Sequence, residues 1–213
     1  MKKSIFYVIL TFLILQIGQG AVAALSYLWF DSFACSLCVS VLFFSAPFLY
    51  LLFKKTRVSI VSREPDIHNS KGFPLLKLIV LSIGLVLINL FMAKILNTHS
   101  NGQEGDTATI LETTTFALET TLLAPVVEEM FYRKWMISYL ERSKVKPAII
   151  LILSSFLFFF AHTNWTNMSF RFDTLIFGIV LFYIYTKYRD VRCCILVHSL
   201  NNLILTAIAI LSR

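Results

Sequence analysis

The sequence has few charged residues and few helix-breaking residues. Only 15% of its 213 residues are Asp, Glu, Lys or Arg, and it contains seven Gly and five Pro. Hydrophobic residues make up 57% of the chain, against about 45–50% in ordinary soluble domains. Apolar runs of about 18 or more residues, the length of a membrane helix, recur along the whole sequence. We therefore expect an all-α, polytopic membrane protein with no room for a separate soluble domain.

Cysteine is scarce, and its spacing argues against a redox or zinc centre built from thiols. Cys35 and Cys38 have the spacing of a redox motif, but no thioredoxin-like strand–helix pattern surrounds them. Cys193 and Cys194 are adjacent, unlike the spaced thiols of a zinc site. We expect buried free thiols that behave as small hydrophobic side chains.

Seven apolar segments are expected to span the membrane. They cover about residues 4–30, 33–53, 73–96, 110–142, 145–162, 172–185 and 193–211. We assign the first three to an amino-terminal part, 1–96, and the last four to a core, 97–213, within one membrane domain. Ala21-Val22-Ala23 resembles a signal-peptide cleavage site, but the apolar character continues to Phe30, which favours an uncleaved first span.

The net charge of +7 is a topology signal rather than evidence for a nucleic-acid partner. Loops 97–106 and 163–169 contain no Lys or Arg, and they alternate along the chain with basic segments at Lys2-Lys3, 54–71, 141–146 and 187–192. This alternation predicts an amino terminus in the cytoplasm. The Lys-, Ile-, Phe- and Asn-rich composition favours a bacterial plasma membrane.

Two adjacent glutamates lie inside the fourth apolar segment. An ionisable side chain at bilayer depth costs about 2.5 kcal/mol or more, so each needs a partner or a function. Arg133 follows Glu129 by four residues, the favourable order for an ion pair within a helix. Glu128 is rotated by about 100° from that face. It is the candidate for chemistry, whereas Glu129 and Arg133 are candidates for support.

Two other segments carry pairs with the same spacing, Phe158 with His162 and His198 with Asn202. Each pair marks one helix face, and polar faces turn toward the interior of a membrane bundle. Val145, at the hairpin turn, follows Glu128 by 17 residues and precedes His162 by 17. At about 1.5 Å per residue, both lie roughly 25 Å from the turn, so we expect them to face each other. The same estimate puts His198 and Asn202 nearer the cytoplasmic end.

Each of these residues also has a purely structural interpretation. A histidine or an asparagine inside a membrane often only joins two helices, and Asn201 is placed to do so as well as Asn202. Phe158 by itself indicates packing. The joint pattern on three separate segments nevertheless favours a site.

The three motifs resemble those of the CPBP family of intramembrane endopeptidases, whose pattern is EExxxR, FxxxH and HxxxN. This family includes CAAX-processing proteases and the bacteriocin-processing or self-immunity proteins, also called Abi proteins. The resemblance covers about residues 120–211 and implies a helical membrane protease. By this resemblance Glu128 and His162 activate water, and His198 and Asn202 hold the oxyanion. Glu129, Arg133 and Phe158 would support them.

The same resemblance leaves the metal question open. Glu128, His162 and His198 would be the zinc ligands of a metalloprotease, but the helical HExxH motif is absent. We favour a glutamic mechanism without a cofactor, because Asn202 suits an oxyanion donor better than a zinc ligand. Zinc is the alternative.

Three functional hypotheses follow. The favoured one is an endopeptidase that acts in the bilayer on a peptide precursor or a lipidated protein. The second is a non-catalytic immunity or regulatory protein that binds a peptide or a membrane partner. The third, a transporter, lacks inverted repeats and paired interrupted helices, and Pro125 is the one interruption near the glutamates. The sequence does not determine the oligomeric state.

Overall fold

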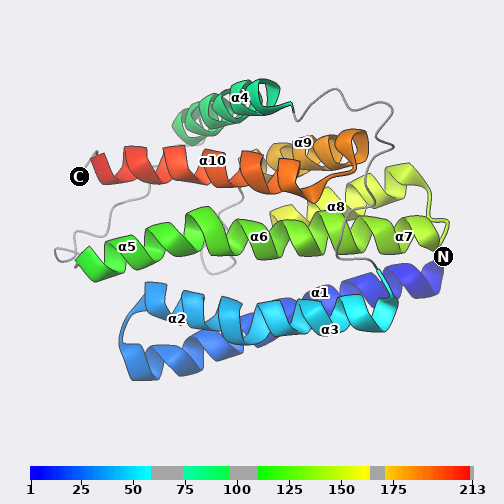
Figure 1. The fold of residues 1–213 in the computed structure, drawn as a ribbon, viewed down its shortest axis with the longest axis horizontal. Helices are drawn as coiled ribbons and strands as arrows, with labels where there is room; N and C mark the ends of the chain where they lie inside the picture. The colour runs from blue at the N-terminus through cyan, green and yellow to red at the C-terminus, as the bar shows by residue number, and fades with distance from the viewer. Residues whose placement is uncertain (59–73, 96–109, 164–170, 212–213) are drawn as a thin grey trace.

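A computed structural model describes residues 1–58, 74–95, 110–163 and 171–211 (Figure 1). Every regular element within these residues is a helix. The expected all-α membrane bundle is therefore confirmed. In chain order the elements are α1 (Lys2–Phe30), α2 (Phe33–Ser40), η1 (Val41–Ser45), α3 (Ala46–Thr56), α4 (Leu75–Ile95), α5 (Ile110–Leu118), η3 (Glu119–Leu123), α6 (Ala124–Glu129), η4 (Met130–Ile137), α7 (Ser138–Arg142), α8 (Pro147–Ala161), α9 (Phe172–Tyr188) and α10 (Val191–Leu211).

Several of these elements join end to end, so each predicted apolar segment corresponds to one helical rod. Elements α2, η1 and α3 form one rod, and α5 to α7 form another. The α5–α7 rod runs through the middle of the molecule, with α1 to α3 on one side and α10 on the other (Figure 1). Five rods are long and apolar enough to cross a membrane, whereas α8 is a shorter apolar helix.

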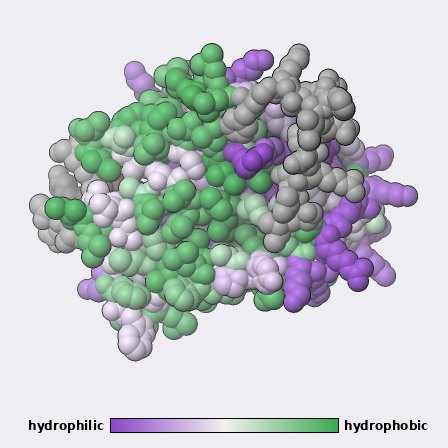
Figure 2. Space-filling view, in the orientation of Figure 1, coloured by the Kyte–Doolittle hydropathy of each residue, from purple (hydrophilic) through white to green (hydrophobic). Residues whose placement is uncertain are grey.

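Hydrophilic residues gather at one end of the bundle, where the amino terminus and α7 lie (Figures 1 and 2). Contacts join the rods there: Arg189 pairs with Glu141 at 2.8 Å, and Arg142 donates to the carbonyl of Arg57 at 3.0 Å. Hydrophobic side chains cover much of the face in Figure 2. Loop 97–106, nearly all of loop 163–169 and most of loop 54–71 lie outside the described residues. The cytoplasmic amino terminus stays a prediction.

The central rod contains two π-helical stretches, η3 and η4, which the sequence analysis did not anticipate beyond the interruption at Pro125. A π turn bonds residue i to residue i+5, and here the N–H of Ala124 bonds the carbonyl of Glu119. The carbonyl of Thr120 then has no donor in its own helix, since Ala124 is engaged and Pro125 has no N–H. This free carbonyl is available to another helix.

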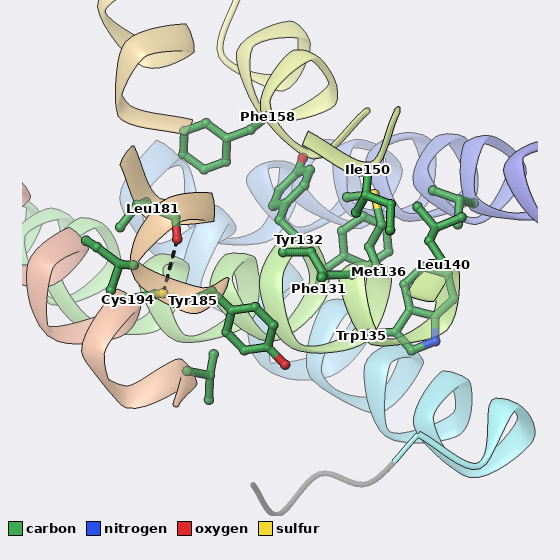
Figure 3. Close-up of a cluster of buried hydrophobic side chains, with 14 of the residues drawn as sticks. Phe131, Tyr132, Trp135, Met136, Leu140, Ile150, Phe158, Leu181, Tyr185 and Cys194 are labelled. Carbon is green, nitrogen blue, oxygen red and sulfur yellow. Dashed lines mark hydrogen bonds between the residues drawn. The ribbon is translucent and has the colours of Figure 1, made fainter. Parts of the chain in front are cut away.

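An aromatic core fixes the central rod against its neighbours (Figure 3). Phe131 stacks on Trp135 with 5.3 Å between ring centroids, and Tyr132 meets Phe158 edge-on at 5.3 Å. The indole N–H of Trp135 donates to the hydroxyl of Thr56 at 3.0 Å. Burial of such side chains and offset ring contacts both stabilise the packing.

Helices α8 and α9 approach each other closely at Gly178. A Cβ atom there would lie 3.2 Å from the Cα of Ser155 and 3.3 Å from its carbonyl oxygen. Small residues permit this separation in membrane bundles. The carbonyl of Gly178 also accepts a hydrogen bond from Arg133 at 3.3 Å.

Gly178→Ala should destabilise the fold by about 1–3 kcal/mol through overpacking, although alanine is the better helix former. The measurement is the unfolding temperature in detergent. Gly84→Ala is the matched control, because no atom lies within 4 Å of a Cβ placed at Gly84. Equal unfolding temperatures for the two variants would contradict the close contact.

Candidate active site

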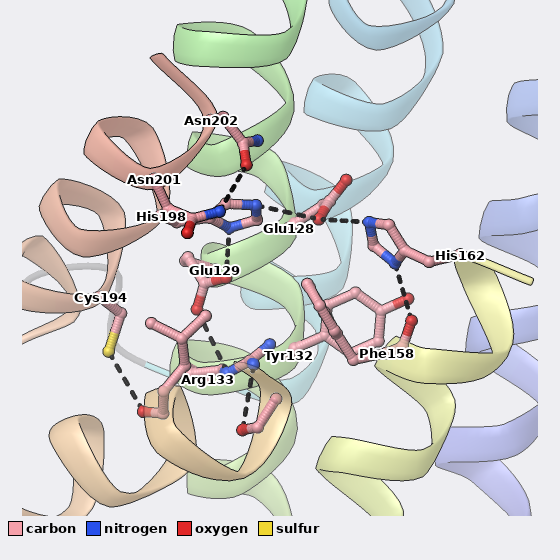
Figure 4. A network of polar contacts seen from close by, with 12 residues as sticks. Glu128, Glu129, Tyr132, Arg133, Phe158, His162, Cys194, His198, Asn201 and Asn202 are labelled. Atoms are coloured by element: carbon pink, nitrogen blue, oxygen red, sulfur yellow. Dashed lines mark hydrogen bonds and ion pairs between the residues drawn. The ribbon is translucent and has the colours of Figure 1, made fainter. Parts of the chain in front are cut away.

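Glu128 lies between two imidazoles in the middle of the bundle (Figure 4). Its Oε2 atom is 3.7 Å from Nε2 of His162 and 4.0 Å from Nε2 of His198. The Glu128 side chain is 26% exposed and that of His162 is 29% exposed. The expectation that Glu128 and His162 face each other across the hairpin is confirmed.

Glu129 points to the opposite, fully buried side. Its Oε2 atom is 3.2 Å from Nε of Arg133, and both side chains are 0% exposed. Its Oε1 atom lies 2.8 Å from Nδ1 of His198. The predicted ion pair is therefore present, and it also holds His198. The two adjacent glutamates differ because one is enclosed and paired, whereas the other is accessible.

The hydrogen bonds define which ring nitrogens carry protons. Nδ1 of His162 lies 2.8 Å from the carbonyl oxygen of Phe158, which can only accept, so Nδ1 donates. In neutral His162 the Nε2 atom then presents a lone pair toward Glu128. His198 similarly donates through Nδ1 to the carboxylate of Glu129, which is paired with Arg133. His198 donates through Nε2 only when it carries both ring protons.

The position of His198 corrects the depth estimate. His198 and Asn202 were expected nearer the cytoplasmic end, yet His198 is level with both glutamates (Figure 4). The estimate assumed that α10 begins at the same level as the turn between α7 and α8, and this assumption was wrong. Burial raises the pKa of Asp190, but hydrogen bonds from Arg192 and the charges of Arg192 and Lys134 lower it below its ordinary value. In the structure α10 contacts η4 of the central rod, which brings His198 to the level of the glutamates.

Asn202 hydrogen-bonds the Thr120 carbonyl that the π turn leaves free. Its Nδ2 donates to the carbonyl oxygen of Thr120 at 2.9 Å, and Nδ2 of Asn201 donates to Oδ1 of Asn202 at 3.4 Å. Both asparagines line the cavity beside Glu128. Of the two NH₂ hydrogens on Asn202, one remains available to a ligand.

The ring of Phe158 packs against both histidines and against Arg133. Its ring centroid is 4.4 Å from that of His162 and 5.8 Å from that of His198. The guanidinium carbon of Arg133 lies 4.6 Å from the same ring centroid, within the range of a cation–π contact. The structure therefore brings all seven predicted site residues together.

Two cavities meet at Glu128 and His162. The larger, about 340 Å³, extends between the central rod, α9 and α10 and is lined mainly by polar side chains, with Ala124, Phe158, Phe177 and Leu205. The smaller, about 250 Å³, lies between α1, the α2–η1 rod and α6. Each is of a size that admits part of a peptide, and the accessible carboxylate stands at their junction.

Sequence reasoning missed several residues of the larger cavity, chiefly Glu119, Asn89 and the Arg171–Asp173 pair. Glu119 precedes Glu128 by nine residues, which in a uniform α-helix places them about 180° apart. The π turn at η3 adds a residue to one turn and brings Glu119 to the same cavity. An acidic residue in an apolar run was the available signal.

Residues 110–204 match the family model described as type II CAAX prenyl endopeptidase Rce1-like. They form an Rce1-like domain of the CPBP family. The domain is similar to that of CAAX-type endopeptidases, and it contains all three motifs that surround Glu128. The chain matches no curated protein and no solved structure.

The donor set of the Rce1-like domain suits zinc in kind, because it offers two imidazoles and a carboxylate. The outer hydrogen bonds of both histidines, to a carboxylate and to a carbonyl, are also those of metal ligands. No group of three His, Cys, Asp or Glu side chains in the described part of the chain has a metal-binding arrangement, however. The residue types thus fit zinc, whereas their arrangement does not match a metal site.

Arg133→Met in the Rce1-like domain should destabilise the fold by about 3–5 kcal/mol, because it leaves the Glu129 charge buried without its partner. The measurement is the free energy of unfolding in detergent micelles. Adding Glu129→Gln to Arg133→Met should recover most of the loss. Additive losses from the two substitutions would contradict a paired interaction.

Proposed function

We propose that the protein is an endopeptidase in which Glu128 and His162 activate the attacking water and His198 and Asn202 stabilise the oxyanion. The single observation that carries this proposal is the position of Glu128. Glu128 lines both cavities, its side chain is 26% exposed, and its Oε2 atom is 3.7 Å from Nε2 of His162. Glu129, by contrast, is fully enclosed and paired with Arg133.

Water activation follows from the two facing acceptors. The lone pair on Nε2 of His162 and the Glu128 carboxylate, whose Oε2 atom is 3.7 Å away, are two acceptors to which one water molecule in the cavity would donate. Glu128 takes the proton as the water oxygen attacks the scissile carbonyl carbon. The proton then passes to the leaving amine as the C–N bond breaks. The imidazole of His162 orients the water, while its own orientation is held by the carbonyl of Phe158.

Oxyanion stabilisation is assigned to α10. Asn202 has one free amide hydrogen, and His198 offers Nε2–H when its ring is doubly protonated beside Glu129. Donors placed where negative charge develops are usually the largest catalytic contribution in acyl transfer. The Glu129–Arg133 pair would hold His198 in place before substrate arrives.

The substrate would be a peptide precursor or a membrane-associated, lipidated protein. The matching family model is described as a CAAX prenyl endopeptidase, which suggests prenylated CAAX proteins as substrates. The site also lies inside an apolar helix bundle. We favour a mechanism without a cofactor. In the zinc alternative, Glu128, His162 and His198 would hold an ion that polarises the substrate carbonyl.

Glu128→Gln should lower peptide hydrolysis by at least about 100-fold, because it removes the base while it keeps the size of the side chain. The measurement is cleavage of fluorogenic peptides, prenylated and unmodified, by protein reconstituted in lipid nanodiscs. Glu112→Gln is the matched control on the same rod, outside both cavities. Full activity in Glu128→Gln would reject the enzyme and favour a binding protein.

Chelation of the reconstituted protein separates the two mechanisms. The glutamic mechanism predicts the same cleavage rate before and after treatment with a chelator. Loss of activity that zinc restores would instead assign Glu128, His162 and His198 to metal binding.

Asn202→Ala should lower kcat by about 100- to 1,000-fold with little change in KM, as for loss of one oxyanion donor. Asn201→Ala is the neighbouring control and should have a smaller effect on kcat. Steady-state kinetics on the cleaved peptide measure both values. Equal effects on kcat and KM would assign Asn202 to substrate binding or packing instead.

A further inference from the structure

The proposed reaction does not explain which residues line the smaller cavity. It shares Glu128 and His162 with the larger cavity, but its outer wall comes from α1, α2 and η1. These elements lie outside residues 110–204, which match the endopeptidase family. The amino-terminal helices therefore add a surface to the catalytic domain directly beside the reactive carboxylate.

One face of α1 forms the wall of this cavity. Gln16, Gln19, Gly20 and Ala23 all line it, and their spacing of three, four and seven residues places them on one helical face. Two amide side chains and two small residues thus follow each other along the cavity. Such polar residues in a membrane helix are expensive and generally functional.

No hydrogen bond joins the side chain of Gln16 or Gln19 to another of the described residues. The hydroxyl of Tyr132, which also lines the cavity, is buried and likewise unpaired among the described residues. An unpaired polar group in an apolar environment costs a few kcal/mol. These groups therefore favour a ligand with both donors and acceptors.

The two glycines on α1 differ in what surrounds them. A Cβ atom at Gly18 would meet the ring of Phe44 in η1, which indicates close packing between the rods. A Cβ atom at Gly20 would have nothing within 4 Å, although Gly20 lines the cavity. Gly18 thus allows α1 and η1 to pack closely, whereas Gly20 leaves open space in the cavity.

We propose that this cavity holds an extended segment of the substrate polypeptide next to the scissile bond. Gln16 and Gln19 hydrogen-bond the main chain of that segment, and Gly20 leaves room for one of its side chains. This inference rests on the proposed endopeptidase function. It assigns substrate selection to α1, whereas bond cleavage is assigned to the Rce1-like domain.

The polar groups favour a peptide segment over a lipid chain. A transmembrane helix bonds all its backbone groups internally, so a protease must unwind it to reach a peptide bond. The unwound segment then exposes N–H and C=O groups that need partners in the bilayer. Side-chain amides supply both a donor and an acceptor, whereas an acyl or prenyl chain would leave them unpaired.

The test measures peptide binding in nanodiscs with Glu128→Gln protein, so that binding is measured with the least cleavage. The probe is a peptide with a CAAX-type carboxyl terminus, in farnesylated and unmodified forms. Gln16→Leu and Gln19→Leu should each weaken binding of both forms by roughly two- to tenfold, the effect of one lost hydrogen bond. An ester in place of one peptide amide should reproduce this loss in the parent but not in the matching Gln variant.

Gly20→Leu tests the space in the cavity. The larger side chain should weaken binding of both peptide forms by at least about tenfold, the effect of blocking a site that contributes about 1.4 kcal/mol. Gly84→Leu is the matched control, because Gly84 also has open space around a Cβ atom but lines neither cavity. It should bind like the parent.

The outcomes separate the inference from the function on which it rests. Unchanged binding in all three α1 variants, or no binding by the parent, overturns the peptide groove. A loss confined to the farnesylated peptide also overturns it, because the cavity then holds the lipid. Weakened binding in the α1 variants, with no cleavage by the unsubstituted protein, retains the groove and rejects the endopeptidase.

Discussion

The site depends on one buried ion pair, that between Glu129 and Arg133. It lies at bilayer depth, and its carboxylate also accepts a hydrogen bond from His198 of α10. Arg133 in turn donates to the carbonyl of Gly178 on α9 and lies over the ring of Phe158 on α8. Four rods are thus tied to one guanidinium–carboxylate pair. Such a pair adds little net stability compared with apolar packing, but removal of one partner is strongly destabilising.

The same pair defines the role of its neighbour. Because Glu129 is turned inward and paired with Arg133, Glu128 is turned about 100° away, toward the two cavities. Its partial exposure, together with the lone pair of His162 opposite, gives a carboxylate and an imidazole beside the same two cavities. The π turn and Pro125 complete the arrangement, since they free the carbonyl that positions Asn202. Local irregularity in the central helix therefore serves the geometry of the site.

Much of the fold and the grouping of the site residues followed from periodicity and spacing. Long apolar runs predict the rods, and the four-residue spacing predicts the Glu129–Arg133 pair, because both are local properties of a helix. The depth of His198 and the contribution of Glu119 could not be predicted in this way. The first depends on where the α9–α10 turn lies relative to η4, and the second on a π turn that has no simple sequence signal. The α1 face was also missed, because Gln16 and Gln19 gain meaning only once α1 lies beside Glu128.

The most direct test of the account is a paired comparison of Glu128→Gln and Glu129→Gln, each measured for unfolding temperature and peptide cleavage at equal protein concentration. The account predicts that Glu128→Gln retains the unfolding temperature of the parent and loses cleavage. It also predicts that Glu129→Gln lowers the unfolding temperature. If both substitutions lower the unfolding temperature equally, or if Glu128→Gln cleaves peptide at the parent rate, the division between a reactive and a structural glutamate is wrong.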